Sequence, residues 1–291
     1  MKYREDVLLK DYTTLKIGGP ASRFYDPQTI EELEAILKEH EENGWPLMIL
    51  GNGSNMLFED EGYDGSIIHI GEALAGIKPL EDNVVRVYAG QENGSLADWL
   101  ADQGLGGYEF ASGIPGTIGG AVIMNAGAYD GEMKDVLKSV GWLDAKGDLH
   151  ETPAEELQLG YRHSWFTDNF GVVVYADLQL QPKDPQEIRE KIADLHHKRY
   201  SKQPMDKASA GSTFKRPAKG YASALIHECG LQGKSVGGAM VSTKHAGFLI
   251  NEDDATCKDF LQLVHEVQEE VKAKKGVDLE LEVRFIPRHA V

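Results

Sequence analysis

The sequence of 291 residues contains two cysteines, no run of 18 apolar residues and few basic side chains. Cys229 and Cys257 have neither a metal-ligating nor a redox spacing, so we expect no metal site and a reduced protein in the cytoplasm. The lack of a long apolar run excludes a membrane-spanning helix, and the polar first residues contain no signal-peptide core. Thirty Lys and Arg against 47 Asp and Glu give a net charge of −17. This charge argues against nucleic acid or an anionic membrane as a partner.

The hydrophobic pattern predicts short strands mixed with helices, which is typical of the α+β class. Helices are expected at 29–43, 96–103, 185–199, 222–229 and 256–275. Strands are expected near 47–50, 66–70, 84–88, 139–144, 172–180 and 279–286. The first and last helices begin with capping boxes, Thr29 to Glu32 and Thr256 to Asp259. A polar stretch at 200–210 indicates a domain boundary.

Two glycine-rich segments give the first chemical signal. One consists of Gly51, Asn52, Gly53, Ser54 and Asn55. The other consists of Ser112, Gly113, Ile114, Pro115, Gly116, Thr117, Ile118, Gly119, Gly120 and Ala121. Glycine permits positive φ and has no Cβ, so backbone amides can approach a pyrophosphate closely. Tight turns alone would also explain the first segment, whereas the glycine density of the second favours phosphate binding.

Three familiar motifs are excluded by single residues. Met56 stands where a dinucleotide-binding fingerprint needs its third glycine. Glu228 stands where a P-loop ending at residues 233–235 needs its first glycine, and Glu269 replaces the second histidine of a zincin motif that begins at residues 265–266. A phosphate-rich cofactor bound without a Rossmann fold or a metal is the remaining interpretation.

The glycine segments, in this order and separation, resemble those of the UDP-N-acetylenolpyruvoylglucosamine reductase (MurB) family. The resemblance extends over nearly the whole chain and includes Thr14–Gly19, Asn125–Tyr129, Tyr161–Ser164, Ala210–Lys215, His245–Asn251 and Glu282–Ile286. The stretch 217–235 is short and lacks the inserted tyrosine segment of some members, so the chain resembles the shorter branch. Which side chain covers the UDP is therefore open.

The resemblance implies a two-subdomain FAD-binding fold of the flavin-oxidase (PCMH-like) type, followed by an α+β substrate-binding domain. The FAD-binding domain would span residues 1–200, with subdomains of approximately 1–75 and 76–200, and the substrate domain 201–291. FAD would rest its pyrophosphate on the glycine segments, and NADPH would reduce it. UDP-N-acetylglucosamine enolpyruvate would then be reduced to UDP-N-acetylmuramate, a peptidoglycan precursor. We expect a monomer.

By the same resemblance Arg162, Ser212 and Glu282 would be the catalytic residues. The planar guanidinium of Arg162 suits the enolpyruvyl carboxylate, which gains electron density when hydride reaches the terminal carbon. Ser212 would donate the proton to the carbon that bears the ether. Glu282 would assist in a protonated form or orient a neighbouring group. Without the resemblance, these residues would be read as a salt-bridge arginine, a turn serine and a solvated glutamate.

The UDP group needs cations on this acidic protein. The predicted substrate-binding residues are Asn125, Tyr129, Lys202, Lys215 and Arg216. One alternative is another FAD-dependent oxidoreductase of the same fold; such enzymes often attach the flavin through His or Cys, and neither occurs in the glycine segments. The other alternative is a non-catalytic protein that binds nucleotide sugars. The colour of the purified protein distinguishes the two flavoenzyme hypotheses from the binding protein.

Overall fold

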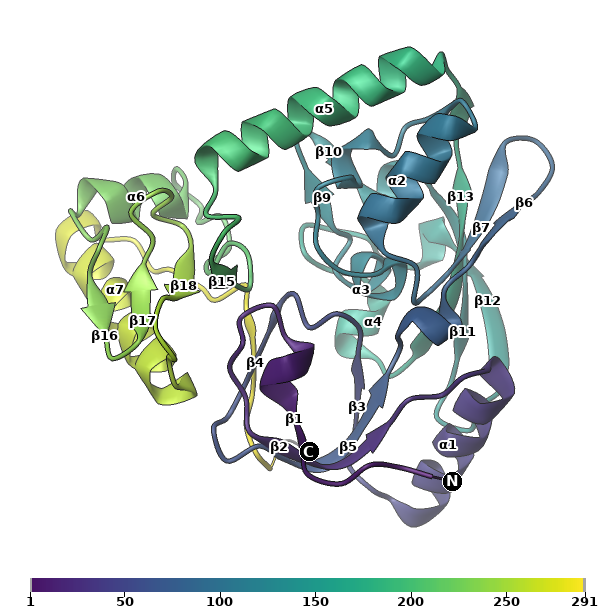
Figure 1. Ribbon diagram of the computed structural model, residues 1–291, viewed down its shortest axis with the longest axis horizontal. Helices are drawn as coiled ribbons and strands as arrows, with labels where there is room; N and C mark the ends of the chain where they lie inside the picture. Colours follow the sequence, from purple (N-terminus) through teal and green to yellow (C-terminus); the bar gives the residue numbers. More distant parts are fainter. Residues whose placement is uncertain (1, 290–291) are drawn as a thin grey trace. The chain divides into compact units, whose positions relative to one another are not determined.

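The computed structural model describes residues 2–289, which form two compact units (Figure 1). The first unit comprises residues 2–3, Tyr25–Asn52 and Ile67–Lys198. The second comprises Arg4–Phe24, Gly53–Ser66 and residues 199–289. The predicted domains are defined by the ligand that each would bind, flavin or substrate. Their bounds near 75 and at 200 therefore stay a prediction. Within residues 2–289, no helix combines the length and apolarity needed to cross a bilayer.

The first unit is built around an antiparallel five-stranded sheet with the order β12-β11-β13-β7-β6. These strands are β6 Ile77–Pro79, β7 Val84–Tyr88, β11 Leu137–Leu143, β12 Leu149–Pro153 and β13 Val172–Gln179. Its helices are α1 Ile30–Asn43, α2 Asn93–Asp102, α3 Ile118–Ile123, α4 Trp165–Asp168 and α5 Pro185–Lys202, the last of which ends in the second unit. Short pieces are β3 Leu47–Leu50, β8 Leu105–Gly106, β9 Gly127–Ala128, β10 Gly131–Glu132, β14 Gln181–Pro182, η2 Glu72–Leu74, η3 Glu109–Ala111, η4 Met133–Asp135 and η5 Ala154–Glu156.

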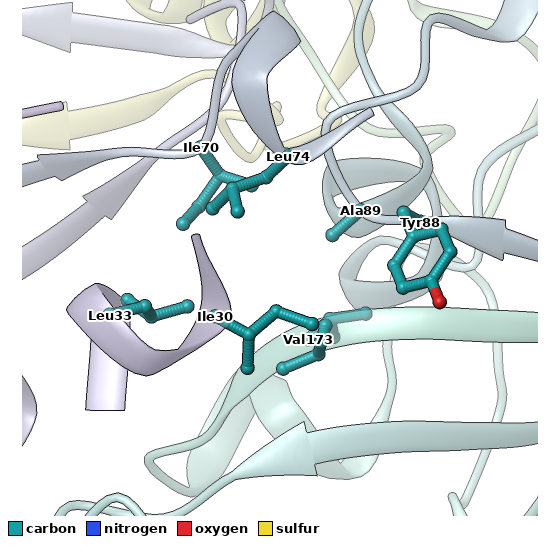
Figure 2. Close-up of a pocket in the computed structure, with 8 residues that line it drawn as sticks. Ile30, Leu33, Ile70, Leu74, Tyr88, Ala89 and Val173 are labelled. Carbon is teal, nitrogen blue, oxygen red and sulfur yellow. The ribbon is translucent and has the colours of Figure 1, made fainter. Parts of the chain in front are cut away.

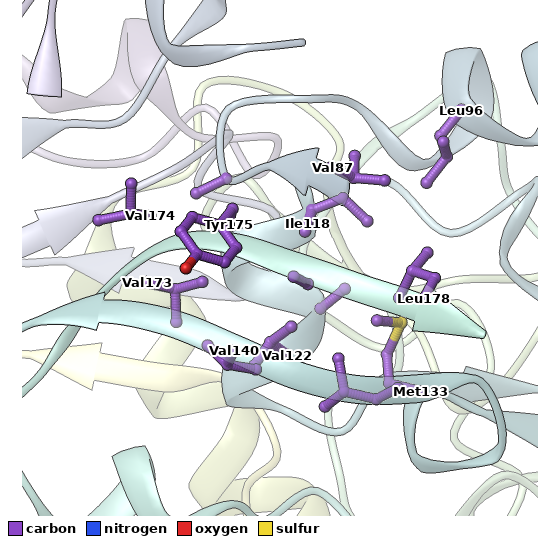
Figure 3. Packing of buried hydrophobic residues seen from close by; sticks show 14 of the residues in the cluster. Val87, Leu96, Ile118, Val122, Met133, Val140, Val173, Val174, Tyr175 and Leu178 are labelled. Atoms are coloured by element: carbon purple, nitrogen blue, oxygen red, sulfur yellow. The ribbon is translucent and has the colours of Figure 1, made fainter. Parts of the chain in front are cut away.

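The core of the first unit lies where α3 packs on β13 and β7 (Figure 3). Seven successive residues of β13 are buried, because the central strand is covered on both faces. Ile118 and Val122 of α3 contact this layer, and Val140 of β11 adds to it. The short helix α3, which contains the end of the second glycine segment, is therefore held against a well-packed sheet.

A small apolar cavity of about 10 Å³ lies beside this core, with room for about one water molecule (Figure 2). It is lined by Ile30, Leu33, Ile70, Leu74, Tyr88, Ala89, Val173 and Val174. The lining contains no charged group, so the cavity is a packing gap between α1 and the sheet.

The second unit contains a four-stranded antiparallel sheet with the order β15-β18-β17-β16, on which α7 packs. These elements are β15 Ala208–Ser209, β16 Ser235–Val236, β17 Ala239–Val241, β18 Leu249–Asn251, α6 Ala222–Glu228 and α7 Cys257–Lys275. The N-terminal segment supplies β1 Val7–Leu8, η1 Leu9–Tyr12, β2 Pro20–Tyr25 and β4 Met56–Phe58. Strand β5, Tyr63–His69, passes from this unit into the first, and the order of its sheet is β1-β2-β5-β3.

Most predicted elements are confirmed to within a few residues, and the capping box of α7 is present with both of its hydrogen bonds. The predicted strand at 279–286 is wrong in extent, because only β19, Arg284–Ile286, is a strand. The preceding residues pair briefly with another segment, through Phe214 and Leu281, before β19 joins β4 in parallel. The alternating apolar pattern of residues 279–286 continues across this change of partner. It therefore predicted one strand where two separate pairings occur.

Candidate active site

The two glycine segments meet in the first unit through Gly51 and Thr117. A Cβ on Gly51 would lie 2.8 Å from the hydroxyl oxygen of Thr117, so only glycine allows this approach. The side-chain amide of Asn52 donates to the carboxylate of Glu92 at 2.8 Å, and Glu92 forms a backbone bridge with Thr117. These contacts place the beginning of the first segment against the middle of the second.

The second segment is anchored by Asn93, a buried residue that the sequence analysis missed. Its side-chain amide donates to the carbonyls of Gly116 at 3.1 Å and Ile114 at 3.3 Å. The hydroxyl of Tyr108 donates to the Asn93 side chain at 2.7 Å, and complete burial raises the pKa of Tyr108. Asn93 and Gly94 are the first residues of α2, and an Asn-Gly pair at a helix start is ordinary, so no local pattern indicated this role.

Two features of the second segment, a buried hydroxyl and a glycine that borders open space, fit a bound phosphate-rich cofactor. The hydroxyl of Ser112 is buried and has no hydrogen-bond partner among residues 2–289. A Cβ on Gly120 would meet no atom within 4 Å, so this part of the segment borders open space. The amides of Ile118 and Gly119 already donate to the carbonyls of Gln91 and Ala89. Gly119 therefore contributes close packing, and its assignment to the cofactor stays a prediction.

We expect Gly116→Val to yield protein largely stripped of FAD. Gly116 has a φ of 116°, a conformation that valine rarely adopts, so the substitution would move the segment off its Asn93 anchor. The measurement is the FAD-to-protein absorbance ratio after purification. Gly230→Val is the matched control, since Gly230 has a φ of 75°, lies outside the glycine segments and should keep its flavin. Full flavin content in the Gly116 variant would contradict the assignment of this segment.

Arg162 lies in a tight turn of the first unit, closed by reciprocal backbone hydrogen bonds between Gly160 and His163 at 3.0 and 3.2 Å. Its φ of 54° is in the left-handed region, at the turn position that normally requires Gly or Asn. The buried amide of Asn125 supports the turn by donating to the Gly160 carbonyl at 2.8 Å. Such strain persists only where surrounding contacts fix it, and it is characteristic of functional positions.

A second strained turn lies beside the first. Tyr129 and Asp130 have φ values of 51° and 66° and connect β9 and β10 as a two-residue hairpin loop, which usually contains Asn and Gly. The guanidinium of Arg162 donates to the Gly127 carbonyl of this hairpin at 3.3 Å. Three predicted site residues, Arg162, Asn125 and Tyr129, are thus brought together within the first unit.

Both polar atoms of the Asn125 side chain form hydrogen bonds within the protein. Its amide also donates to Glu132 at 2.6 Å, and its oxygen accepts the backbone N–H of Lys134 at 2.9 Å. Because the residue is fully buried, it holds the Arg162 turn to the hairpin. Its predicted contact with substrate is untested and stays a prediction.

Ser212 and Glu282 lie on adjoining extended segments of the second unit. The N–H of Glu282 donates to the carbonyl of Thr213 at 2.9 Å, directly after Ser212. The buried hydroxyl of Thr213 accepts the N–H of Leu249 at 2.9 Å, which ties the segment to β18. Ser212 is exposed and Glu282 is half-buried. Ser212, the proposed proton donor, and Glu282 are thus positioned by one short ladder of hydrogen bonds between their two extended segments.

The last residue of the first glycine segment contacts the same ladder. The side-chain amide of Asn55 donates to the Glu282 carbonyl at 3.0 Å, and the Asn55 carbonyl accepts the N–H of Arg284 at 2.9 Å. Gly53 precedes it with a φ of 57°, where a Cβ would lie 2.2 Å from the Tyr12 carbonyl oxygen. The end of the glycine segment is therefore fixed to the residues that follow Glu282 within the second unit.

The predicted cations are not gathered into one cluster by the contacts of the described residues. Lys215 forms an ion pair with Glu280. The guanidinium of Arg216 lies 4.2 Å from the ring centre of Tyr221, an exposed tyrosine of the short stretch 217–235. Lys202 is exposed in the last turn of α5. Their roles in substrate binding stay a prediction.

Comparison with known proteins identifies the class of protein as a flavoprotein. Residues 21–153 match the family model "FAD binding domain", and residues 203–286 match "UDP-N-acetylenolpyruvoylglucosamine reductase, C-terminal domain". These matches confirm the predicted α+β fold, in which a FAD-binding domain is followed by a second α+β domain.

Similar proteins cover nearly the whole chain. A UDP-N-acetylenolpyruvoylglucosamine reductase of Limosilactobacillus reuteri is 44% identical over 99% of this chain and 96% of its own length. The corresponding protein of Geobacillus kaustophilus is 43% identical over 97% of this chain and 92% of its own. The crystal structure of that reductase (MurB) from Thermus caldophilus has a TM-score of 0.84 at 39% identity and covers 98% of this chain and 100% of its own. The chain belongs to the UDP-N-acetylenolpyruvoylglucosamine reductase family.

Proposed function

We propose that this protein is an NADPH-dependent flavoenzyme that reduces UDP-N-acetylglucosamine enolpyruvate to UDP-N-acetylmuramate in peptidoglycan synthesis. Family membership over nearly the full chain carries the proposal. The strained turns around Arg162 and the Ser212–Glu282 ladder support it from the structure. The protein would act on this small UDP-sugar as a cytoplasmic monomer, without a nucleic-acid or membrane partner.

The chemistry that FAD would supply when bound is hydride transfer, with NADPH as the source of the hydride. The residues that would hold FAD lie in the two glycine segments, Gly51–Asn55 and Ser112–Ala121. Gly51 contributes a close approach without a Cβ, Gly116 contributes a positive φ, and the buried hydroxyl of Ser112 contributes a hydrogen-bonding group. Residues 201–291 would form the substrate-binding domain.

Each proposed catalytic residue has a distinct task in reducing the enolpyruvyl double bond. Arg162 binds the carboxylate and stabilises the negative charge that develops there when the terminal carbon accepts hydride. Ser212 then gives its hydroxyl proton to the carbon that bears the ether oxygen. Glu282 orients these groups from the segment next to Ser212. One hydride and one proton thus complete the reduction.

We expect the purified protein to be yellow, to be bleached by NADPH without oxygen and to be reoxidised by the enolpyruvyl sugar. The measurement is the visible absorbance of the flavin in each step, since the flavin carries the hydride between the two substrates. UDP-N-acetylglucosamine without the enolpyruvyl group is the control, because it has no double bond to accept hydride. A colourless protein that cannot be reconstituted with FAD would overturn the proposal. Bleaching without reoxidation would favour another flavin oxidoreductase.

A further inference from the structure

The imidazole of His163, the residue after Arg162, has a hydrogen-bond acceptor at each ring nitrogen. Its Nδ1 lies 3.1 Å from the carbonyl oxygen of Gln158, and its Nε2 lies 3.0 Å from a carboxylate oxygen of Asp168. A carbonyl and a carboxylate can only accept, so both hydrogen bonds form only when both nitrogens carry a proton. The arrangement therefore selects the imidazolium form.

The ring connects the two sides of the strained turn. Gln158, on the entering side, has a φ of 50°, and Arg162 has a φ of 54°. Asp168 is the last residue of α4, on the leaving side. Residues in the left-handed region return to common conformations unless neighbouring contacts hold them. His163 is placed to hold the conformations of Gln158 and Arg162. Its ring hydrogen-bonds the Gln158 carbonyl before the turn and the Asp168 carboxylate of α4 after it.

We propose that His163 is a positioning residue that fixes the turn carrying Arg162, in the orientation that the reduction of the enolpyruvyl group requires. This inference rests on the proposed function, because it gives Arg162 a task only if the protein acts on that carboxylate. His163 itself need not touch the substrate. It acts by fixing the conformation of Arg162.

The position of this turn should then depend on pH. Asp168 presents a carboxylate to the ring, while Gln158 presents a neutral carbonyl and Arg162 adjoins the ring as a cation along the chain. The hydrogen bond to Asp168, followed by that to Gln158, raises the pKa of His163 above its ordinary value. Both bonds are present together below the ordinary value, and one of them is lost as pH rises through the raised value, because the neutral ring keeps a single N–H. Reoxidation of the flavin by substrate should slow over that interval.

The test combines NMR titration of His163 with rapid-mixing measurement of flavin reoxidation by the enolpyruvyl sugar at saturating concentration. In the wild type the rate should fall with rising pH at the pKa that NMR gives for His163. Asp168→Asn should move both values together to lower pH. His163→Gln should abolish this inflection and lower the rate about ten- to a hundredfold, as for a misplaced catalytic group. Melting temperatures should change little, since His163 and Asp168 have side chains 37% and 70% exposed.

His150→Gln is the matched control. His150 forms the same kind of pair with Asp144 at 3.0 Å, on a surface hairpin of the same unit, and its loss should leave the profile unchanged. If Asp168→Asn shifts the pKa of His163 but leaves the rate profile unmoved, the positioning role alone is overturned. A wild type that never reoxidises its flavin with the sugar would overturn the proposed function as well, whatever NMR gives for His163.

Discussion

Ser212→Ala should bind FAD and be bleached by NADPH at the wild-type rate, yet be reoxidised by the enolpyruvyl sugar about 10²–10⁴-fold more slowly. The proton of Ser212 is needed only after hydride has reached the substrate, so the first half-reaction does not involve it. The substitution should leave the fold intact. Ser212 is exposed, and the hydrogen bonds of its segment come from Thr213 and the backbone.

The measurement is rapid-mixing absorbance of the flavin in each half-reaction separately. Ser235→Ala is the matched control, because Ser235 is an exposed serine of β16 in the same unit and should leave both rates unchanged. Ser212→Cys, with a more acidic group, should recover part of the rate. Equal slowing of both half-reactions in the Ala variant would assign Ser212 to flavin positioning. If neither slows, the proton comes from another group, and Glu282 is the next to test.

Arg162→Lys should reduce the enolpyruvyl step about ten- to a hundredfold, the order expected when a charge-assisted hydrogen bond of about 1.5–3 kcal/mol is lost. Lysine keeps the charge but lacks the planar fork that binds a carboxylate at two points. It would also have to satisfy the Gly127 carbonyl, to which the guanidinium donates at 3.3 Å, with the same single ammonium group.

The same half-reactions and a melting curve distinguish catalysis from folding in the Arg162 variant. Flavin reduction by NADPH should be less affected, and the melting temperature should stay within a few degrees of wild type, a shift that corresponds to about 1 kcal/mol or less. Arg189→Lys is the control, since Arg189 is an exposed arginine of α5 that pairs with Asp102. Near-normal turnover of the enolpyruvyl sugar in Arg162→Lys would leave Arg162 with a structural role only.

Local sequence signals were sufficient for most helices and for the glycine segments. The capping residues Thr29 and Thr256 lie at helix starts because their hydroxyls accept an N–H three residues later, an interaction within one turn. Glycines with positive φ, such as Gly53 and Gly116, lie where other residues are strained. These features depend on neighbours along the chain, so the sequence alone could predict them.

The tertiary structure alone decided how the site residues are held. The anchor at Asn93 and the support of the Arg162 turn by Asn125 involve carbonyls 23 and 35 residues away along the chain. The left-handed conformation of Arg162 contradicts its local preference, so no local rule predicts it. The strand expected at 279–286 was shortened for the same reason, since its length depends on partners near 213–215 and 56–58. Sequence determines which groups are present, but hydrogen bonds between distant segments determine where each one points.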